Sequence, residues 1–458
     1  MGTAHHGSIT EGWWTFPCTY KGSRHEITSL DTACNAKNPR SFCYTPRLDM
    51  RRHGLDFPAL LVHPTPGRTT VTAGVWLASG SAHEPRALAG ATHMVEHLTL
   101  RRCGGRDRFA LARLVDRLGG DVDAWTSTEL MGVTVQTTVD ALIEGLELLV
   151  DAILDPSFEE EDVELERRVS LAELELLQDD PAERVEEDVL RAAWGDHPLA
   201  RPVIGTSRSL AALTRHALRR HHATMVQPGR VLAAVTGDVD RAELAEHLQR
   251  LPLAAPVSPP SLPPLRWRGR HHEVRRPSAD QAHCRLAFPA VTAADPEAPA
   301  VGVLNRILGV GASSRLFQRL REVEGLTYDI WSSTMLRRGG GLLEIGWACA
   351  PAVLNQVWTM VSEELRRVAI DLVDDEVEVA KEGLARGLAM DVEMPAAYCA
   401  MDVAEVLDRG RRFDTELARG EIAAVTPKQV RRIAADMLRP ERMATALCGP
   451  DGVSVQVA

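Results

Sequence analysis

The sequence contains very few lysines, no long apolar run and no regular cysteine spacing. Only Lys21, Lys37, Lys381 and Lys428 are lysines among 52 basic residues, and 63 acidic residues give a formal net charge of -11. This charge disfavours a surface that neutralises nucleic-acid phosphates or lies on anionic lipid. We therefore expect neither nucleic acid nor a membrane among the partners.

Other absences narrow the class of protein. No stretch approaches the roughly 18 consecutive apolar residues of a membrane-spanning helix. The first residues, MGTAHHGSITEGWW, lack the basic start and apolar core of a secretory signal, which predicts a cytoplasmic protein. The eight cysteines form no C-x-x-C pair, so neither a zinc ribbon nor a disulfide framework is indicated. Cys18, Cys34 and Cys43 cluster near the start and would pair only in an oxidising environment.

The length of 458 residues predicts two domains rather than one compact core. Residues 1–48 have sparse periodicity and are interpreted as an N-terminal extension. The stretch PLAAPVSPPSLPPLRW is rich in proline, which predicts an extended, semi-rigid linker over residues 253–266. The linker separates a first domain over residues 49–252 from a second domain over residues 267–458.

The two domains look like repeats of one another. RLGGDVDAWTSTELMGVTVQTTVDALIEGLELLVDAIL in the first parallels EVEGLTYDIWSSTMLRRGGGLLEIGWACAPAVLNQVWTMVSEEL in the second. Each stretch predicts a pair of strands followed by an amphipathic helix. The implied fold is α+β, with two homologous domains that each pack α-helices on a mostly antiparallel β-sheet.

Five polar residues of the first copy of the repeat have no polar counterpart in the second copy. With Trp125 set against Trp331, the residues His93, Glu96 and His97 fall on Pro299, Gly302 and Val303. With Pro181 set against Pro395, the residues Glu166 and Glu173 fall on Ala380 and Gly387. Scaffold residues would be kept in both copies, so these five are interpreted as chemical.

The stretch GATHMVEHLTL predicts a helix on which His93 and His97 lie one turn apart on one face. Two imidazoles in that arrangement suit one zinc ion, which then needs a third ligand, most often a carboxylate. Glu173 lies among leucines on a second predicted helix, where a carboxylate without a partner is costly to bury. The alternatives are structural histidines and a solvated acidic helix. Cys103 either approaches the metal or is a buried thiol, which we favour.

These residues resemble the pitrilysin and mitochondrial processing peptidase family of zinc peptidases, the inverzincins, whose motif is H-x-x-E-H. In that family the third ligand lies 76 positions after the second histidine, which matches Glu173 and His97. Glu166 matches a glutamate that orients a ligand. GASSRLFQRLREVEGLTYDIWS carries the family's Arg and Tyr pair as Arg321 and Tyr328. The resemblance runs from about Pro58 to the C-terminus.

The resemblance implies a zinc endopeptidase that acts on peptides or unfolded segments inside a closed chamber. One zinc ion per chain, on His93, His97 and Glu173, would activate water, with Glu96 as general base. Arg321 would hold a substrate backbone oxygen, and Tyr328 would help to stabilise the oxyanion. We expect the substrate to add as a β-strand at five residues: Ala124, Trp125, Thr126, Ser127 and Thr128.

The partners follow from the same resemblance. Family members of this length predict a homodimer, or a heterodimer with a paralogous subunit, whose substrate is a general peptide or a specific precursor peptide. The alternative function is a non-catalytic structural or partner-binding subunit of a peptidase-like complex. Residues 1–48 carry Trp13, Trp14 and Phe16, and they either pack on the chamber mouth or the partner subunit, or form a disordered N-terminus.

Overall fold

The first β-sheet contains five strands. The computed structural model describes residues 59–277 and 279–455. Its first sheet has the spatial order β1-β5-β2-β4-β3, and β1 pairs with β5 in parallel while the other pairs are antiparallel. The strands are β1 (Leu60–Pro64), β2 (Thr70–Leu77), β3 (Asp121–Thr126), β4 (Met131–Thr138) and β5 (Val231–Gly237).

The second sheet repeats this topology. Its order, β6-β10-β7-β9-β8, places each strand where the corresponding strand of the first sheet lies, and the single parallel pair is again the outermost one, between β6 and β10. The strands are β6 (His271–Arg275), β7 (Ala282–Ala290), β8 (Thr327–Arg337), β9 (Gly340–Cys349) and β10 (Ala444–Gly449). The predicted fold class, two homologous α+β halves with mostly antiparallel sheets, is confirmed.

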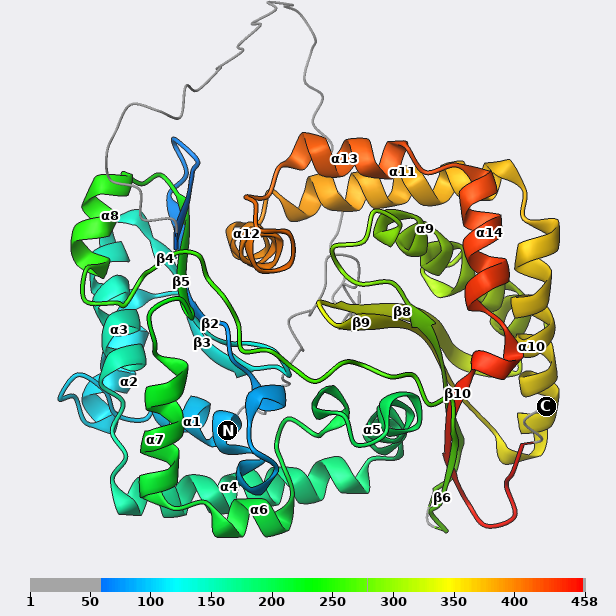
Figure 1. Ribbon diagram of the computed structural model, residues 1–458, viewed down its shortest axis with the longest axis horizontal. Helices are drawn as coiled ribbons and strands as arrows, with labels where there is room; N and C mark the ends of the chain where they lie inside the picture. The colour runs from blue at the N-terminus through cyan, green and yellow to red at the C-terminus, as the bar shows by residue number, and fades with distance from the viewer. Residues whose placement is uncertain (1–58, 278, 456–458) are drawn as a thin grey trace, which may run out of the picture. The chain divides into compact units, whose positions relative to one another are not determined.

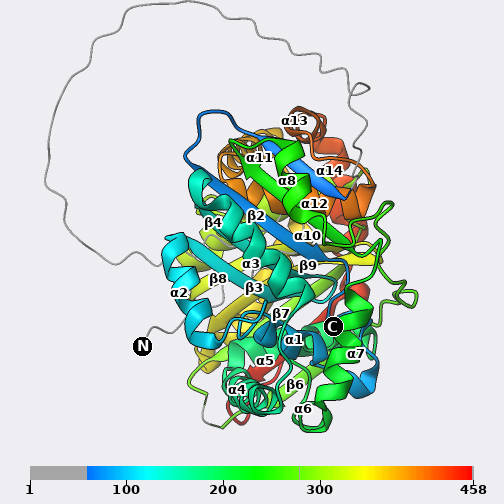
Figure 2. The ribbon, with the colours of Figure 1, turned by 90° about the vertical axis from the view of Figure 1, so that its left-hand side faces the viewer.

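Helices cover the sheets, as Figures 1 and 2 show. In the first half, α3 packs on β2 and β4, and α1 packs between β3, α4 and α7, which encloses one hydrophobic core. The helices are α1 (Ala91–Thr99), α2 (Arg108–Leu118), α3 (Leu142–Leu154), α4 (Glu160–Asp179), α5 (Pro181–Trp194), α6 (Ser207–Ala212), α7 (Arg215–Met225) and α8 (Arg241–Leu248).

The second half has its own core, in which α9 packs on β8 and α10 packs on α14. The helices are α9 (Ala298–Gly309), α10 (Leu354–Asp371), α11 (Asp374–Asp391), α12 (Pro395–Arg409), α13 (Thr415–Ala423) and α14 (Pro427–Met437), together with a π-helix, Phe317–Val323. No helix or strand is described over residues 253–266, and the proposed domain boundaries stay predictions.

Two helices are exchanged between the halves. Helix α5 leaves the first half and packs on β6, β7 and β10 of the second sheet, as Figure 1 shows. Helix α12 leaves the second half and packs on β1, β2 and β5 of the first sheet, where Cys399 and Val403 meet Trp76 and Leu232. Both helices begin with a proline, Pro181 and Pro395. The sequence pattern did not reveal this exchange.

The sheets share a tryptophan–glycine pair across neighbouring strands. Trp125 of β3 lies opposite Gly132 of β4, and Trp331 of β8 lies opposite Gly346 of β9. A Cβ atom on Gly346 would lie 2.5 Å from the indole of Trp331, and one on Gly132 would lie 2.7 Å from that of Trp125. Each glycine therefore leaves room for the ring that crosses it, which supports the alignment of Trp125 with Trp331.

Within the described residues, no helix is long and apolar enough to cross a bilayer. The five cysteines in this part of the chain are free and buried: Cys103, Cys284, Cys349, Cys399 and Cys448. The expectations for Cys18, Cys34, Cys43 and residues 1–48 lie outside the described residues.

Replacing Gly346 with alanine should lower the free energy of unfolding by about 1–3 kcal/mol, because the added Cβ would overlap the Trp331 indole. The control is Gly387→Ala in α11, where a Cβ meets no atom within 4 Å and the helix should gain roughly 0.5–1 kcal/mol. Urea unfolding measures both variants. Equal stability of the wild type and Gly346→Ala would contradict this packing.

Candidate metal centre

Helix α1 presents two imidazoles on one side and apolar residues on the other. Met94, Val95 and Leu98 are fully buried in the first core. The rings of His93 and His97 lie 4.5 Å apart between centroids, with their planes inclined by 58°. The sequence prediction of two histidines on one helical face agrees with this geometry.

Glu173 of α4 completes the cluster. One ligand atom each from His93, His97 and Glu173 lies within 4.8 Å of the others. Glu173 Oε2 is 3.7 Å from His93 Nε2 and 3.8 Å from His97 Nε2. Tetrahedral ligands at zinc bond lengths lie roughly 3.4 Å apart. Two nitrogens and one oxygen at this spacing therefore fit a zinc ion after a small contraction.

A carboxylate on the far side of His97 orients its ring. Glu166 Oε2 lies 3.0 Å from His97 Nδ1, so this nitrogen carries the proton and Nε2 is left to face Glu173. Arg101 donates to the other oxygen, Oε1, of Glu166 at 2.7 Å and to Asp162 at 2.8 Å. The predicted orienting role of Glu166 has the contact that it requires.

Glu96 lies beside the cluster but outside the group of three converging ligands. Its side chain is buried, with 8% of the residue exposed. Burial raises the pKa of Glu96 to about 7, while His97 and the Thr126 hydroxyl act to lower it. A carboxyl group that exchanges a proton near neutral pH is suited to general-base chemistry.

The predicted substrate-binding residues divide into two groups. Ala124, Trp125 and Thr126 belong to β3, which is the outer strand of its sheet and, within the described residues, pairs only with β4. Ser127 and Thr128 follow in the turn, and their carbonyl oxygens accept hydrogen bonds from the backbone N–H groups of Ser81 and Ala82. The open edge of the sheet therefore ends at Thr126.

Arg321 and Tyr328 lie next to one another in the second half. Arg321 belongs to the π-helix, and its guanidinium lies 4.6 Å from the centre of the Phe317 ring and 4.8 Å from that of Tyr328. Tyr328 is 81% exposed. Within the described residues, no hydrogen bond or ion pair joins either side chain to the histidine cluster. Their reach into the metal site stays a prediction.

Cys103 follows α1 and is buried, which confirms the interpretation of a thiol in the core. Burial raises its pKa to about 11. The residue is not among the converging ligands.

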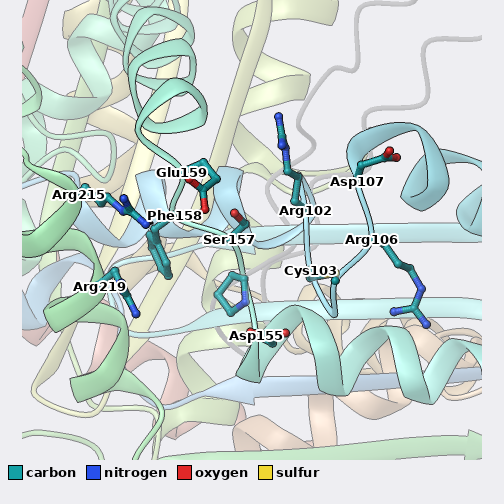
Figure 3. Close-up of a pocket in the computed structure, with 12 residues that line it drawn as sticks. Arg102, Cys103, Arg106, Asp107, Asp155, Ser157, Phe158, Glu159, Arg215 and Arg219 are labelled. Carbon is teal, nitrogen blue, oxygen red and sulfur yellow. Dashed lines mark ion pairs between the residues drawn. The ribbon is translucent and has the colours of Figure 1, made fainter.

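A separate polar pocket of about 500 Å³ lies beside Cys103. Figure 3 shows Arg215 and Arg219 on one side of it and Arg102 and Arg106 on the other. Asp107, Asp155 and Glu159 also line it, while Arg102 and Arg106 are paired with Asp162 and Asp151. The charges nearly cancel and the arginines do not converge, so the pocket indicates no particular ligand.

The start of α1 is held by residues that the sequence analysis missed. Glu84 accepts hydrogen bonds from the backbone N–H groups of Gly90 and Thr92. The Thr92 hydroxyl lies 2.9 Å from Nε2 of His221, a buried residue of α7. Burial lowers the pKa of His221 to about 4. No motif marks these contacts, because they join segments that are distant in the sequence.

Comparison with protein families gives two matches. Residues 60–207 match the family described as "Insulinase (Peptidase family M16)", and residues 212–384 match the "Peptidase M16 inactive domain". The first range contains the converging ligands and Glu96, and the second contains Arg321 and Tyr328. The half that matches the inactive domain is the half whose repeat lacks the histidines.

Relatives cover most of the chain. An uncharacterized zinc protease of Mycobacterium leprae is 32% identical over 392 residues, which span 84% of this chain and 88% of the relative. The beta subunit of the mitochondrial-processing peptidase of Mus musculus is 24% identical over 84% of this chain and 81% of its own. A solved peptidase M16 inactive domain from Pseudomonas fluorescens has a TM-score of 0.78 at 20% identity, over 86% of this chain and 96% of its own. That structure shows a shared fold.

Protonation of His221 should weaken the folded state below neutral pH. The pKa of His221 is lowered from 6.5 to about 4 in the folded protein. Above pH 6.5 the residue is neutral in both the folded and the unfolded state, and its contribution to the free energy of unfolding is complete. The contribution is lost as pH falls from 6.5 to 4, by about 3 kcal/mol in total. His221→Gln keeps a partner for Thr92 and should flatten this decline. Urea unfolding of metal-free protein at pH 7 and 4.5 tests it; an unchanged decline in the variant would refute the assignment.

Proposed function

The chain belongs to peptidase family M16, and we propose that it is a zinc endopeptidase that hydrolyses peptides or unfolded segments. The observation that carries the proposal is the convergence of His93, His97 and Glu173 next to the buried carboxyl group of Glu96. Relatives named zinc proteases support the metal and the reaction class.

His93, His97 and Glu173 would hold the zinc ion. When bound there, zinc would supply Lewis-acid chemistry that acidifies water and polarises the scissile carbonyl group. The hydrogen bond from His97 to Glu166 would leave the other ring nitrogen of His97 available to the ion, and Arg101 donates to Glu166 in turn. A residue of α4, Glu166, therefore positions a ligand of α1.

Glu96 would act as the general base. It takes a proton from the attacking water as the carbon–oxygen bond forms, and it returns a proton to the leaving amine as the carbon–nitrogen bond breaks. Its burial raises the pKa of the carboxyl group above its ordinary value in the metal-free chain, which makes the carboxylate a stronger proton acceptor. Glu96 lies on α1 between His93 and His97 in the sequence, and the charges of His97 and Glu173 act on its carboxyl group.

The edge of β3 would bind the substrate as an added strand. Ala124, Trp125 and Thr126 lie on the outer strand next to α1, and backbone hydrogen bonds at a sheet edge recognise extended chains with little dependence on side chains. Ser127 and Thr128 would contribute less, because their carbonyl oxygens are already bonded. The recognition favours an unfolded segment over a folded domain.

Arg321 and Tyr328 would contact the substrate from the second half. The resemblance to the family implies this role for both residues, and the exposure of Tyr328 leaves the residue accessible to a bound peptide. Stacking on Phe317 and Tyr328 restrains the Arg321 guanidinium. We propose that Arg321 donates to a substrate backbone oxygen and that Tyr328 donates to the developing oxyanion.

The quaternary structure is also a proposal. Similarity to a subunit named beta of a processing peptidase, and to a chain of Complex III2 from Candida albicans, supports assembly with a homologous chain. We propose a homodimer or a pair with a paralogous subunit that encloses a chamber. A cytoplasmic location remains a prediction.

A non-catalytic subunit is the second candidate. The inactive-domain description applies to residues 212–384, where Pro299, Gly302 and Val303 lie on α9 in place of the histidine motif. The first half keeps all three ligands and Glu96. The enzymatic function is therefore favoured.

Glu96→Gln should bind zinc as well as the wild type but cleave peptides about 10²–10⁴ times more slowly, because it removes the base and leaves the ligands. Bound zinc is measured by elemental analysis, and cleavage of a mixed peptide library is measured by mass spectrometry. Glu175→Gln, at an exposed position of α4, is the matched control and should keep wild-type activity. The proposal fails if the wild type cleaves nothing or if Glu96→Gln is fully active.

Tyr328→Phe should lower kcat by about 10²–10³ with little change in KM, because an oxyanion donor acts in the transition state rather than on the bound substrate. Steady-state kinetics on one peptide found in the library separates the two constants. An unchanged kcat would remove Tyr328 from the mechanism without affecting the assignment of Glu96.

A further inference from the structure

Helix α1 begins without a capping side chain of its own. Its N-cap residue is Gly90, with φ of 89°, and the first-turn N–H groups of a helix need acceptors from elsewhere. Glu84, in the preceding loop, supplies two of them. The N–H of Gly90 donates to Glu84 Oε2 at 2.8 Å, and the N–H of Thr92 donates to Oε1 at 2.6 Å. Only 5% of Glu84 is exposed.

We propose that Glu84 is a positioning residue that sets the orientation of α1, and with it His93, Glu96 and His97, relative to the substrate edge of β3. This inference rests on the proposed peptidase function for its catalytic consequence. The capping contact itself is a property of the chain without metal.

The two hydrogen bonds require both oxygens of a carboxylate. Each oxygen accepts from one backbone N–H, and the negative charge faces the positive end of the helix. Glutamine has nearly the same size, but its amide would turn an N–H group toward one of the two donors. Burial raises the pKa of Glu84 to about 7, and the bonds from Thr92 and Gly90 act to lower it. The experiment is therefore made at about pH 8, where the carboxylate dominates.

The start of α1 makes close backbone contacts with residues 204 and 205. A Cβ on Gly90 would lie 2.4 Å from the carbonyl oxygen of Ile204, and one on Gly205 would lie 2.5 Å from that of Ala89. Arg201, from the same segment, donates to the backbone oxygen of Glu84 at 3.1 Å. The loop with Glu84, the start of α1 and residues 201–205 therefore form one connected support.

The same loop is bonded to the turn that ends the substrate edge. Ser81 N–H donates to the Ser127 carbonyl oxygen at 3.0 Å, and Ala82 N–H donates to that of Thr128 at 2.8 Å. A Cβ on Gly80 would lie 2.4 Å from the Ser127 oxygen, so no other residue fits this approach without a shift. Only two residues, Ala82 and His83, separate Ser81 from Glu84. Through this loop, the carboxylate of Glu84 links the metal helix with the end of β3.

Glu84→Gln is the principal test, and Glu405→Gln is the matched control. Glu405 is an equally buried glutamate of α12 whose arginine partners, Arg409 and Arg411, both retain Glu421. In metal-free protein, hydrogen–deuterium exchange of peptides covering residues 88–100 should be about tenfold faster in Glu84→Gln than in the wild type. Glu405→Gln should leave exchange in this segment unchanged.

With zinc added, Glu84→Gln should bind the ion roughly tenfold more weakly, in the range seen when residues that support metal ligands are replaced. It should also lower kcat at saturating zinc by a similar factor while KM stays within about twofold. A variant that is only less stable would retain wild-type kcat in its folded fraction. Glu84→Asp keeps the charge but shortens the side chain, so it should fall between wild type and Glu84→Gln and provides the test if the glutamine variant does not fold.

Wild-type exchange over residues 88–100 in both Glu84 variants would overturn the proposal. So would faster exchange with unchanged zinc affinity and, in an active enzyme, unchanged kcat. If the wild type cleaves no peptide, the peptidase function fails, and the exchange and zinc-affinity measurements still decide whether Glu84 positions α1.

Discussion

The position of one short helix governs the site. Helix α1 must bury Met94, Val95 and Leu98 in the first core while it turns His93 and His97 toward Glu173. A nine-residue helix has too little intrinsic stability to hold an orientation by itself. Its orientation depends on contacts at its ends and sides, which come from Glu84, from His221 and from the packing of α4 and α7.

The equivalent helices of the two halves, α1 and α9, are held at their starts by different contacts. Helix α9 occupies the place of α1 in the second half, and its start is held locally, where Asp295 accepts from the N–H of Glu297. Its residues Pro299, Gly302 and Val303 are buried as ordinary core. One sheet topology thus supports both a cluster of converging ligands and an apolar helix. The exchange of α5 and α12 joins the halves, because each helix packs on the sheet of the other half.

Sequence patterns were most informative where chemistry and periodicity coincide. The spacing of His93 and His97 predicts one helical face, and the resemblance to a peptidase family supplied Glu173 and Glu166, whose contacts agree with those roles. The binding of substrate at the edge of β3 stays a prediction. Its five residues are continuous in sequence. The carbonyl oxygens of the last two, Ser127 and Thr128, already accept hydrogen bonds from the backbone N–H groups of Ser81 and Ala82. Arg321 and Tyr328 meet one another in the structure, and their contact with a substrate depends on a bound peptide.

The sequence by itself determined the fold class, the repeat and the shared helical face of His93 and His97, because helical and strand periods are local properties of a chain; Glu173 and Glu166 came from the resemblance to a peptidase family. Only the tertiary structure decided that α5 and α12 change sheets, that the edge of β3 closes after Thr126, and that Glu84 caps the metal helix. These features are contacts between distant segments. Each contact either supplies an acceptor to a buried backbone N–H group or buries apolar surface. The partner in such a contact is distant in the sequence, so it is defined only in the folded chain.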